Sequence, residues 1–272
     1  MTPAVVRERD DPRIADYLAV REAELLARRG LFVAESRIVV ERLLASQRFA
    51  VRSLLLSETA LAALTPALAA IPGEPLVFVA PRELISSLAG YPVHQGCLAL
   101  AERGPATAPE ALVAEAGAGL LVALEQLGDP DNVGGVFRNA RAFGADGVLL
   151  APGGADPLYR KAIRVSMGAA LRVPFARDEA WPASLDALRR AGFTVIGLTP
   201  GAGAIAIDHA AVDLPPARRV ALVLGSEGDG LSARALRQCD TLVRIPMAPG
   251  VDSLNASAAS AVALHRLAVP LE

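Results

Sequence analysis

The order of apolar and polar residues along the chain predicts two regions in which helices and strands alternate. In the first region, strands are expected at residues 31–36, 51–57, 75–80 and 96–102. Helices are expected at residues 14–30, 37–46, 61–70 and 81–89. This alternation predicts a small α/β unit in which helices cover a sheet.

A second region of the same kind begins with the continuously apolar run 120–127, which is typical of a strand buried in a parallel sheet. Val133, Val136, Phe137 and Ala140 then recur at helical spacing, and Gly144 ends that helix. Further strands are expected at 147–152, 193–200, 218–225 and 242–247, and further helices at 184–192 and 233–239. The region therefore predicts an α/β domain with a parallel sheet.

Proline, alanine and glycine dominate residues 104–119, between the two regions. Such a composition is typical of a connection between domains. We therefore predict a first domain at residues 1–104, a linker at 105–117 and a second domain at 118–272. At 272 residues the chain is long enough for two domains. Hydrophobic residues make up 53% of the chain but aromatic residues only 4%, and this composition predicts a core of Ala, Leu and Val.

The formal net charge is −2, so any surface that binds nucleic acid must be local. The most basic run contains five cationic side chains, which could face RNA or simply be solvated: Arg160, Lys161, Arg164, Arg172 and Arg177. The two cysteines stand alone, without metal or redox spacing, which fits a reducing cytoplasm. No segment is apolar and long enough for export or membrane insertion, so we expect a cytoplasmic protein without membrane or metal.

The stretch after residue 247 combines a loop with a helix of unusually small residues. A helix is predicted to open at Ser253, and residues 255–261 are nearly all Ala and Ser. Ser253 and Asn255 suit helix capping or the binding of an electron-rich ligand. The small side chains would let another backbone approach closely, where an ordinary core helix would more often carry Leu or Ile.

Four loops are predicted to form one ligand pocket, because the carboxyl ends of parallel strands meet at one sheet edge. These loops follow the strands at 120–127, 193–198, 220–225 and 242–247. Arg138 leans over the turn that contains Gly134 and Gly135, which either leave room for a ligand or allow close helix packing. GSEGDG has neither the dinucleotide spacing nor a P-loop ending, and the three scattered histidines do not favour a hydrolase.

Three segments together resemble a known family: NVGGVFRNARAFGADGVLL, LVLGSEGDGLS and IPMAPGVDSLNASAASAVAL. In order and spacing they are similar to the three motifs of the SpoU/TrmH branch of the SPOUT RNA methyltransferases, over roughly residues 118–268. FVAES, RIVVERLL and VHQGCLAL resemble the substrate-binding domain, similar to ribosomal protein L30e, that often precedes it. The resemblance implies a catalytic domain with a trefoil knot, a homodimer, and methyl transfer from S-adenosylmethionine (AdoMet) to a ribose 2′-hydroxyl of structured rRNA or tRNA.

Carried over residue by residue, the resemblance implies two sets of site residues. The implied cofactor contacts are Thr199, Gly225, Gly230, Ile245 and Leu254. The implied catalytic residues are Asn132, Arg138, Glu227, Ser253 and Asn255. The family usually has Asn or Ala where this chain has Ser226, and Val where it has Ala256, but neither difference removes a reacting group.

Two other classes of function compete with a methyltransferase. One is a non-catalytic RNA-binding protein that keeps the fold, and the other is a nucleotide-dependent oxidoreductase. The intact implied catalytic residues argue against the first, and the missing G-x-G-x-x-G spacing argues against the second. As a guanidinium stays protonated in proteins, Arg138 is expected to bind phosphate or stabilise an alkoxide and not to act as a base.

Overall fold

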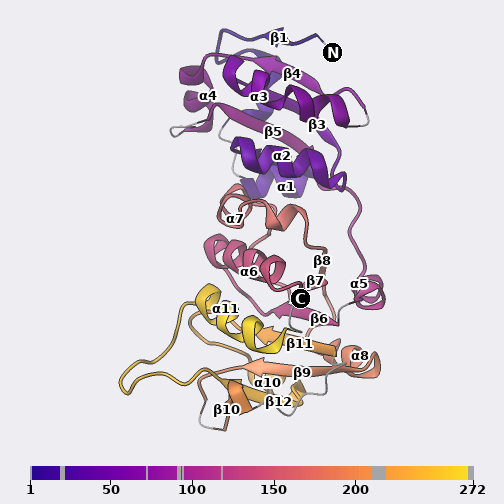
Figure 1. Cartoon of the computed structure of the whole chain (residues 1–272), viewed down its shortest axis with the longest axis vertical. Coiled ribbons are helices and arrows are strands. Elements are labelled where there is room, and N and C mark those ends of the chain that lie inside the picture. Colours follow the sequence, from indigo (N-terminus) through magenta and orange to yellow (C-terminus); the bar gives the residue numbers. More distant parts are fainter. Residues whose placement is uncertain are drawn as a thin grey trace. The chain divides into compact units, whose positions relative to one another are not determined.

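The computed structural model forms two compact units (Figure 1). The N-terminal unit comprises residues 1–105 and 157–172, and the C-terminal unit comprises residues 106–156 and 173–272. Within these, the structure describes residues 2–18, 22–71, 73–90, 93, 95–117, 119–201, 203–209 and 219–268. The domain limits predicted from the sequence stay a prediction, but segment 157–172 packs with the N-terminal unit although it follows the linker.

The N-terminal unit contains a mixed sheet of five strands in the order β1-β4-β3-β5-β2. β1, β4 and β3 run parallel, whereas β5 is antiparallel to both β3 and β2. The strands are β1 Ala4–Val5, β2 Leu31–Glu35, β3 Val51–Leu56, β4 Leu76–Val79 and β5 Cys97–Glu102. Four of these were predicted, and the two-residue β1 is too short to show a period in the sequence.

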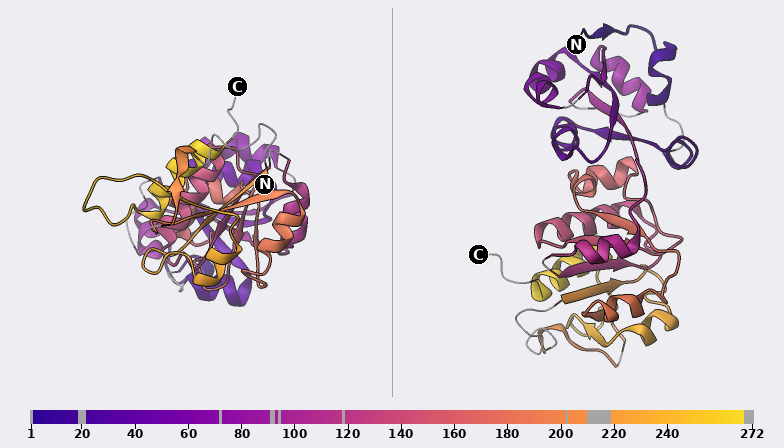
Figure 2. Two further views of the ribbon diagram at one scale, coloured as in Figure 1. Left: turned by 90° about the horizontal axis from the view of Figure 1, so that it is seen from below. Right: turned by 90° about the vertical axis from the view of Figure 1, so that its right-hand side faces the viewer.

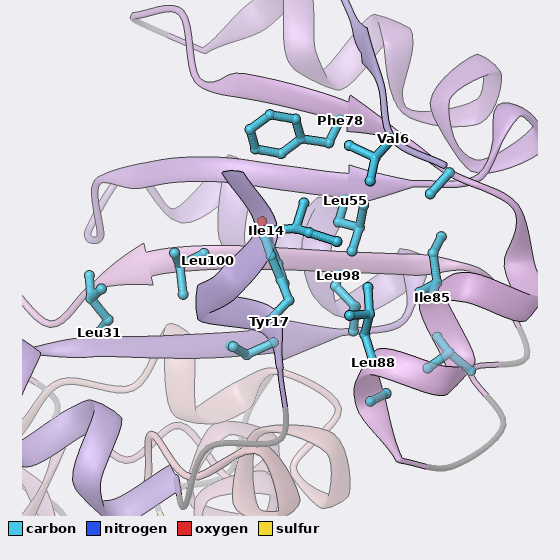
Figure 3. Close-up of a cluster of buried hydrophobic side chains, with 14 of the residues drawn as sticks. Val6, Ile14, Tyr17, Leu31, Leu55, Phe78, Ile85, Leu88, Leu98 and Leu100 are labelled. Atoms are coloured by element: carbon cyan, nitrogen blue, oxygen red, sulfur yellow. The ribbon is translucent and has the colours of Figure 1, made fainter. Parts of the chain in front are cut away.

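Helices pack on this sheet through apolar side chains. They are η1 Pro12–Tyr17, α1 Glu22–Arg29, α2 Arg37–Ser46, α3 Glu58–Ala70, α4 Arg82–Ala89, α7 Arg160–Val165 and η2 Ala169–Leu171. Figure 3 shows the core that Ile14 and Tyr17 of η1 and Ile85 and Leu88 of α4 form against the strands. The Tyr17 hydroxyl and the Ser53 hydroxyl are hydrogen-bonded at 2.8 Å inside this core. This pairing satisfies two polar groups that burial would otherwise leave without partners.

The single helix predicted at residues 14–30 is wrong. A 3-10 helix, η1, starts at an Asp11 cap whose carboxylate accepts the Arg13 backbone N–H at 2.9 Å, and it ends at Tyr17. The α-helix α1 then covers Glu22–Arg29, and Gly30 follows with a φ of +62°. Gly30 therefore ends the second helix as expected, but burying both Ile14 and Tyr17 required a separate, tighter helix before it.

The C-terminal unit contains a seven-stranded sheet in the order β10-β12-β9-β11-β6-β7-β8. All neighbouring strands in it pair in parallel, as the continuously apolar runs predicted. The strands are β6 Leu120–Leu124, β7 Gly147–Leu150, β8 Phe175–Arg177, β9 Phe193–Leu198, β10 Ile205–Ala206, β11 Arg219–Leu224 and β12 Thr241–Arg244. Because the chain passes from β8 back across to β9, the strand order reverses beside the central strands β6 and β11.

Helices cover both faces of this sheet (Figure 2). They are α5 Pro109–Glu115, α6 Pro130–Ala142, α8 Leu185–Arg190, α10 Ala233–Gln238 and α11 Ala256–Leu267. Leu112 of α5, Leu185 and Leu188 of α8 and Ala235 of α10 share one core cluster with the strands. α6 and α11 lie side by side elsewhere in the unit (Figure 1). α5 lies within the predicted linker, so those residues are helical and part of the packed unit.

The basic run at residues 160–177 does not form a single cationic surface. Arg160 is largely buried and pairs with Glu35 at 3.5 Å, and Arg177 pairs with the buried Asp156. Lys161, Arg164 and Arg172 are exposed. His94, a further candidate phosphate contact in the N-terminal region, lies outside the described residues.

Candidate functional site

A cavity of about 470 Å³ opens at the carboxyl edge of the seven-stranded sheet. This volume lies in the range of small-molecule sites. Its walls come from the loops after β9, β11 and β12 and from the start of α11. Three of the four loops predicted from the sequence therefore meet at one cavity. The loop after β6 is not among the lining residues, and its Leu127 lines a separate small cavity instead.

The loop after β11, residues 225–231, forms one wall of this cavity. It is closed by two backbone hydrogen bonds between Ser226 and Gly230, each 3.1 Å long, and Gly230 has a φ of +67°. A Cβ atom at Gly225 would overlap the backbone of Gly230. Only glycine fits at position 225 with the loop in this shape, so Gly225 and Gly230 of GSEGDG are explained by a tight turn beside the cavity.

The start of α11 is fixed by two asparagines. The Asn255 side-chain oxygen accepts the backbone N–H groups of Ser257 and Ala258 at 3.0 and 3.2 Å, so Asn255 is the N-cap. Its amide group donates to the side-chain oxygen of the buried Asn132 at 2.7 Å. The helix begins at Ala256 and not at Ser253 as predicted, which leaves Ser253 in the segment that lines the cavity.

α6 and α11 approach closely through small residues. A Cβ at Gly135 would overlap the side chain of Ser257, with 2.5 Å to its Cβ atom. Asn139 donates through its amide to the Ser257 carbonyl at 2.8 Å and the Ser260 hydroxyl at 2.9 Å. The interpretation of Gly135 as room for a ligand is therefore wrong. Gly135 allows helix packing, and the small residues of α11 are explained partly by α6 of the same chain.

Seven of the ten residues implied by the resemblance line the cavity: Thr199, Gly225, Glu227, Gly230, Ile245, Ser253 and Leu254. Asn132 and Asn255 do not line it but form the pair that fixes α11. Arg138 is exposed on α6 and is not among the lining residues. Glu227 is exposed, and no described hydrogen bond joins it to Ser253 or Asn255.

Sequence reasoning missed Glu125, which the structure places one residue beyond β6. This carboxylate is 5% exposed and accepts hydrogen bonds from Ser232 and Trp181. Its signal was present in the sequence as the single charged residue within the apolar run 120–127. A charged side chain is rarely buried in such a run unless hydrogen bonds or an ion pair compensate for its lost hydration.

The lining of the cavity is apolar with acidic groups and without cations. The acidic side chains are Glu227, Asp229 and Asp252, and no described lining residue is Arg, Lys or His. Such a lining repels phosphate groups and favours a ligand with positive charge and apolar parts. Within the described parts of the chain, no three His, Cys, Asp or Glu side chains gather where they could hold a metal ion. None of the described helices combines the length and apolar character needed to cross a membrane.

The SpoU rRNA methylase family matches residues 119–265 of this chain, which include every element that lines the cavity. The chain belongs to this family. Its resemblance to the SpoU/TrmH branch, drawn from three short segments, is thereby confirmed. The matched residues begin just before β6 and end within α11, and they include the segment 157–172 that packs with the N-terminal unit.

Other family members share most of the chain. An uncharacterized tRNA/rRNA methyltransferase of Mycobacterium tuberculosis is 40% identical over 94% of this chain and 88% of its own length. The methyltransferase AviRb of Streptomyces viridochromogenes is 26% identical with a TM-score of 0.77, covering 94% of this chain and 96% of its own. AviRb has also been crystallised with AdoMet. An RNA 2′-O ribose methyltransferase structure is 25% identical with a TM-score of 0.76 and covers 97% of each chain.

Proposed function

We propose that this SpoU family member transfers a methyl group from AdoMet to a ribose 2′-hydroxyl of structured RNA, with rRNA favoured over tRNA. The family, the AdoMet-bound AviRb structure and the 2′-O ribose methyltransferase support the reaction class. The observation that carries the proposal is the cavity at the carboxyl edge of the sheet, with its glycine-dependent wall and acidic lining.

The cavity fits AdoMet better than it fits a phosphorylated cofactor. AdoMet carries positive charge on its sulfonium and amino groups, and the carboxylates of Glu227, Asp229 and Asp252 complement such charges. The same carboxylates would repel the pyrophosphate of a dinucleotide. AdoMet would supply the methyl group on its sulfonium. Leu224, Ile245 and further apolar side chains would exclude water around the rest of the cofactor.

The residues outside the cavity have separate tasks in this proposal. The Asn132 and Asn255 pair holds the start of α11, so the wall that contains Ser253 and Leu254 stays in place. Arg138 lies exposed on α6, where its guanidinium can bind an RNA phosphate or stabilise the alkoxide that forms as the hydroxyl loses its proton.

Calorimetry with AdoMet and with NAD, followed by transfer assays on total rRNA and tRNA, tests the proposal. We expect AdoMet binding without NAD binding. We also expect a methylated nucleotide whose 3′ phosphodiester bond resists alkaline cleavage, because its 2′-hydroxyl is blocked. NAD binding without AdoMet binding would refute the cofactor. Methylation of a base would refute the ribose 2′-hydroxyl as the acceptor.

Arg138→Ala should abolish methyl transfer while AdoMet affinity stays within about twofold of wild type, because Arg138 does not line the cavity. Arg141→Ala is the matched control, since Arg141 is also exposed on α6. We expect this control to keep most of the transfer activity. Loss of AdoMet binding in a folded Arg138→Ala protein would place the guanidinium at the cofactor instead.

The alternative function is an RNA-binding protein that keeps the fold without catalysis. It predicts RNA binding that does not depend on AdoMet and no methyl transfer to any RNA fraction. The glycine-dependent loop and acidic cavity argue against it, because a protein that binds only RNA has no use for them.

A homodimer and a trefoil knot in the C-terminal unit belong to the same proposal. The segment between β12 and α11 extends away from the sheet (Figures 1 and 2) and carries exposed Val251 and Leu254, at 48% and 39%. Val262 of α11 is 39% exposed as well. A second subunit would cover this apolar surface.

The N-terminal unit is proposed to be the RNA reader, with an L30e-like fold. Arg28, Arg37 and Arg52 are exposed there, and each forms a surface ion pair with a nearby carboxylate. Such surface pairs are weak enough for phosphate to compete. RNA affinity should therefore fall with salt, with a slope of about 0.7 per neutralised phosphate for single strands on a log-log scale.

A further inference from the structure

Glu125 is a buried carboxylate next to the cofactor cavity of the proposed function. Oε1 accepts the Trp181 indole N–H and the Ser232 hydroxyl, and Oε2 accepts the Ser232 backbone N–H, each at 2.8 Å. The side chain is 5% exposed, and no described ion pair involves it. Its charge is therefore balanced by hydrogen-bond donors, and two of the three donors belong to Ser232.

The backbone of Glu125 makes a second connection to the same loop. Its N–H donates to the Leu224 carbonyl at 2.8 Å. Leu224 precedes the loop 225–231 and Ser232 follows it, so one residue just beyond β6 holds both ends of the loop. The Ser232 hydroxyl also accepts the Ala235 backbone N–H at 3.1 Å, which links the end of the loop to the start of α10.

The structure assigns Glu125 as the positioning residue of the loop 225–231, which it holds in the shape that binds the cofactor. This inference rests on the proposed function, because that function makes the cavity the AdoMet site. The argument is geometric. The loop carries the mutual Ser226 and Gly230 hydrogen bonds and forms one wall of the cavity. Glu125 does not line the cavity and acts only through Leu224 and Ser232.

A carboxylate is needed at this position because all three partners donate. In Glu125→Gln one of the two acceptor oxygens is replaced by an NH2 group, which can only donate. In one orientation of the amide this NH2 group faces the Ser232 N–H, and in the other it faces the Trp181 N–H and the Ser232 hydroxyl. Losing a buried charge-assisted hydrogen bond and leaving a donor unsatisfied corresponds to roughly tenfold to a hundredfold in an equilibrium. We expect Glu125→Gln to bind AdoMet weaker by about that factor.

The experiment compares wild-type and Glu125→Gln full-length protein by two independent measurements. Hydrogen exchange without any ligand follows the peptide that covers residues 225–232, and its exchange should be about tenfold or more faster in Glu125→Gln. Steady-state kinetics with varied AdoMet should show a raised KM for AdoMet with kcat recovered at saturation, since the chemistry itself is not touched. RNA affinity should be unchanged.

Trp181→Phe is the matched control, because it removes a donor to the same carboxylate without touching the loop. We expect AdoMet affinity within about twofold of wild type. If Glu125→Gln does not fold, Ser232→Ala decides, since it removes one donor and the cap of α10 but keeps the backbone bond to Oε2. Faster loop exchange and weaker AdoMet binding are expected there too.

The assignment is overturned if the loop amides of the deciding variant exchange at the wild-type rate. It is also overturned if Trp181→Phe loses as much AdoMet affinity as that variant. A wild-type protein that binds no AdoMet would refute the proposed function instead. The ligand-free exchange measurement would still decide in that case whether Glu125 holds the loop.

Discussion

Replacing Gly135 by alanine tests whether α6 and α11 are packed as closely as the structure shows. The new Cβ would overlap the Ser257 side chain and lie 2.5 Å from the Ser257 Cβ atom. Rotating the Ser257 hydroxyl away cannot remove the second overlap, because a Cβ atom moves only with its backbone. One of the two helices must therefore shift.

Two opposing effects set the size of the change. Overpacking typically costs about 1 to 3 kcal/mol, while Gly→Ala inside a helix gains about 1 kcal/mol. The net expectation for Gly135→Ala is a loss of about 1 kcal/mol, and at most about 2 kcal/mol, in the free energy of unfolding. In a Ser257→Gly background the overlap is absent, so the same substitution should stabilise by about 1 kcal/mol.

Urea unfolding followed by tryptophan fluorescence measures this effect in the relevant unit. Trp181 is the only tryptophan of the chain, and it packs against the core cluster of the C-terminal unit. Gly128→Ala is the control, since a Cβ there meets open space and should change stability by less than about 0.5 kcal/mol. The four proteins with and without each change at 135 and 257 form a double-mutant cycle.

The sign reversal is the decisive result. If Gly135→Ala is stabilising in both backgrounds, helix propensity outweighs packing, and α6 and α11 are not held together at this contact. If it is equally destabilising in both backgrounds, the strain lies elsewhere than at Ser257.

Three further predictions concern the loop, the thiols and the assembly. Gly225→Ala should weaken AdoMet binding at least about tenfold by calorimetry, whereas Gly228→Ala, where a Cβ meets open space, should not. Burial raises the pKa of Cys97 to about 12 and that of Cys239 to about 11, so iodoacetamide at pH 8 should label both much faster in urea than in the native protein. Stability should also fall above pH 9, where unfolded thiols lose protons that the folded protein retains. Ala261 is half-buried on α11 beside the exposed Val262, so Ala261→Trp should give monomers by light scattering and abolish methyl transfer. A fully active wild-type monomer would contradict the dimer.

The sequence was sufficient for the parts of the fold that depend on long apolar runs. The strands β6, β9 and β11 are buried on both faces, so their residues are apolar at nearly every position. The meeting of three loops at one cavity followed from this parallel arrangement alone. Strands of two or three residues, such as β1, β8 and β10, are too short to show a pattern in the sequence. They are recognised as strands only through their hydrogen bonds to a neighbouring strand.

The start of α11 shows why boundaries were harder to predict. Ser253 and Asn255 are both good N-cap residues, so the local sequence offers two possible starts. Asn255 is the cap because its amide reaches Asn132, a residue on another helix. Likewise, nothing local to Glu125 shows that Ser232 and Trp181 will surround it. Both outcomes depend on residues that are distant in the sequence and adjacent in the fold.

α6 illustrates how one helix combines these constraints. Its apolar stripe is buried, as the helical spacing predicted, and consists of Val133, Val136, Phe137 and Ala140. A second stripe at spacings of three and four residues, Asn132, Gly135 and Asn139, faces α11. A single amphipathic pattern cannot reveal two buried stripes, and a small polar stripe reads equally well as a binding surface. Arg138 belongs to neither stripe and is exposed. Since the second stripe fixes α11 and hence one wall of the cavity, the position of Arg138 relative to the proposed cofactor is set by packing at Gly135.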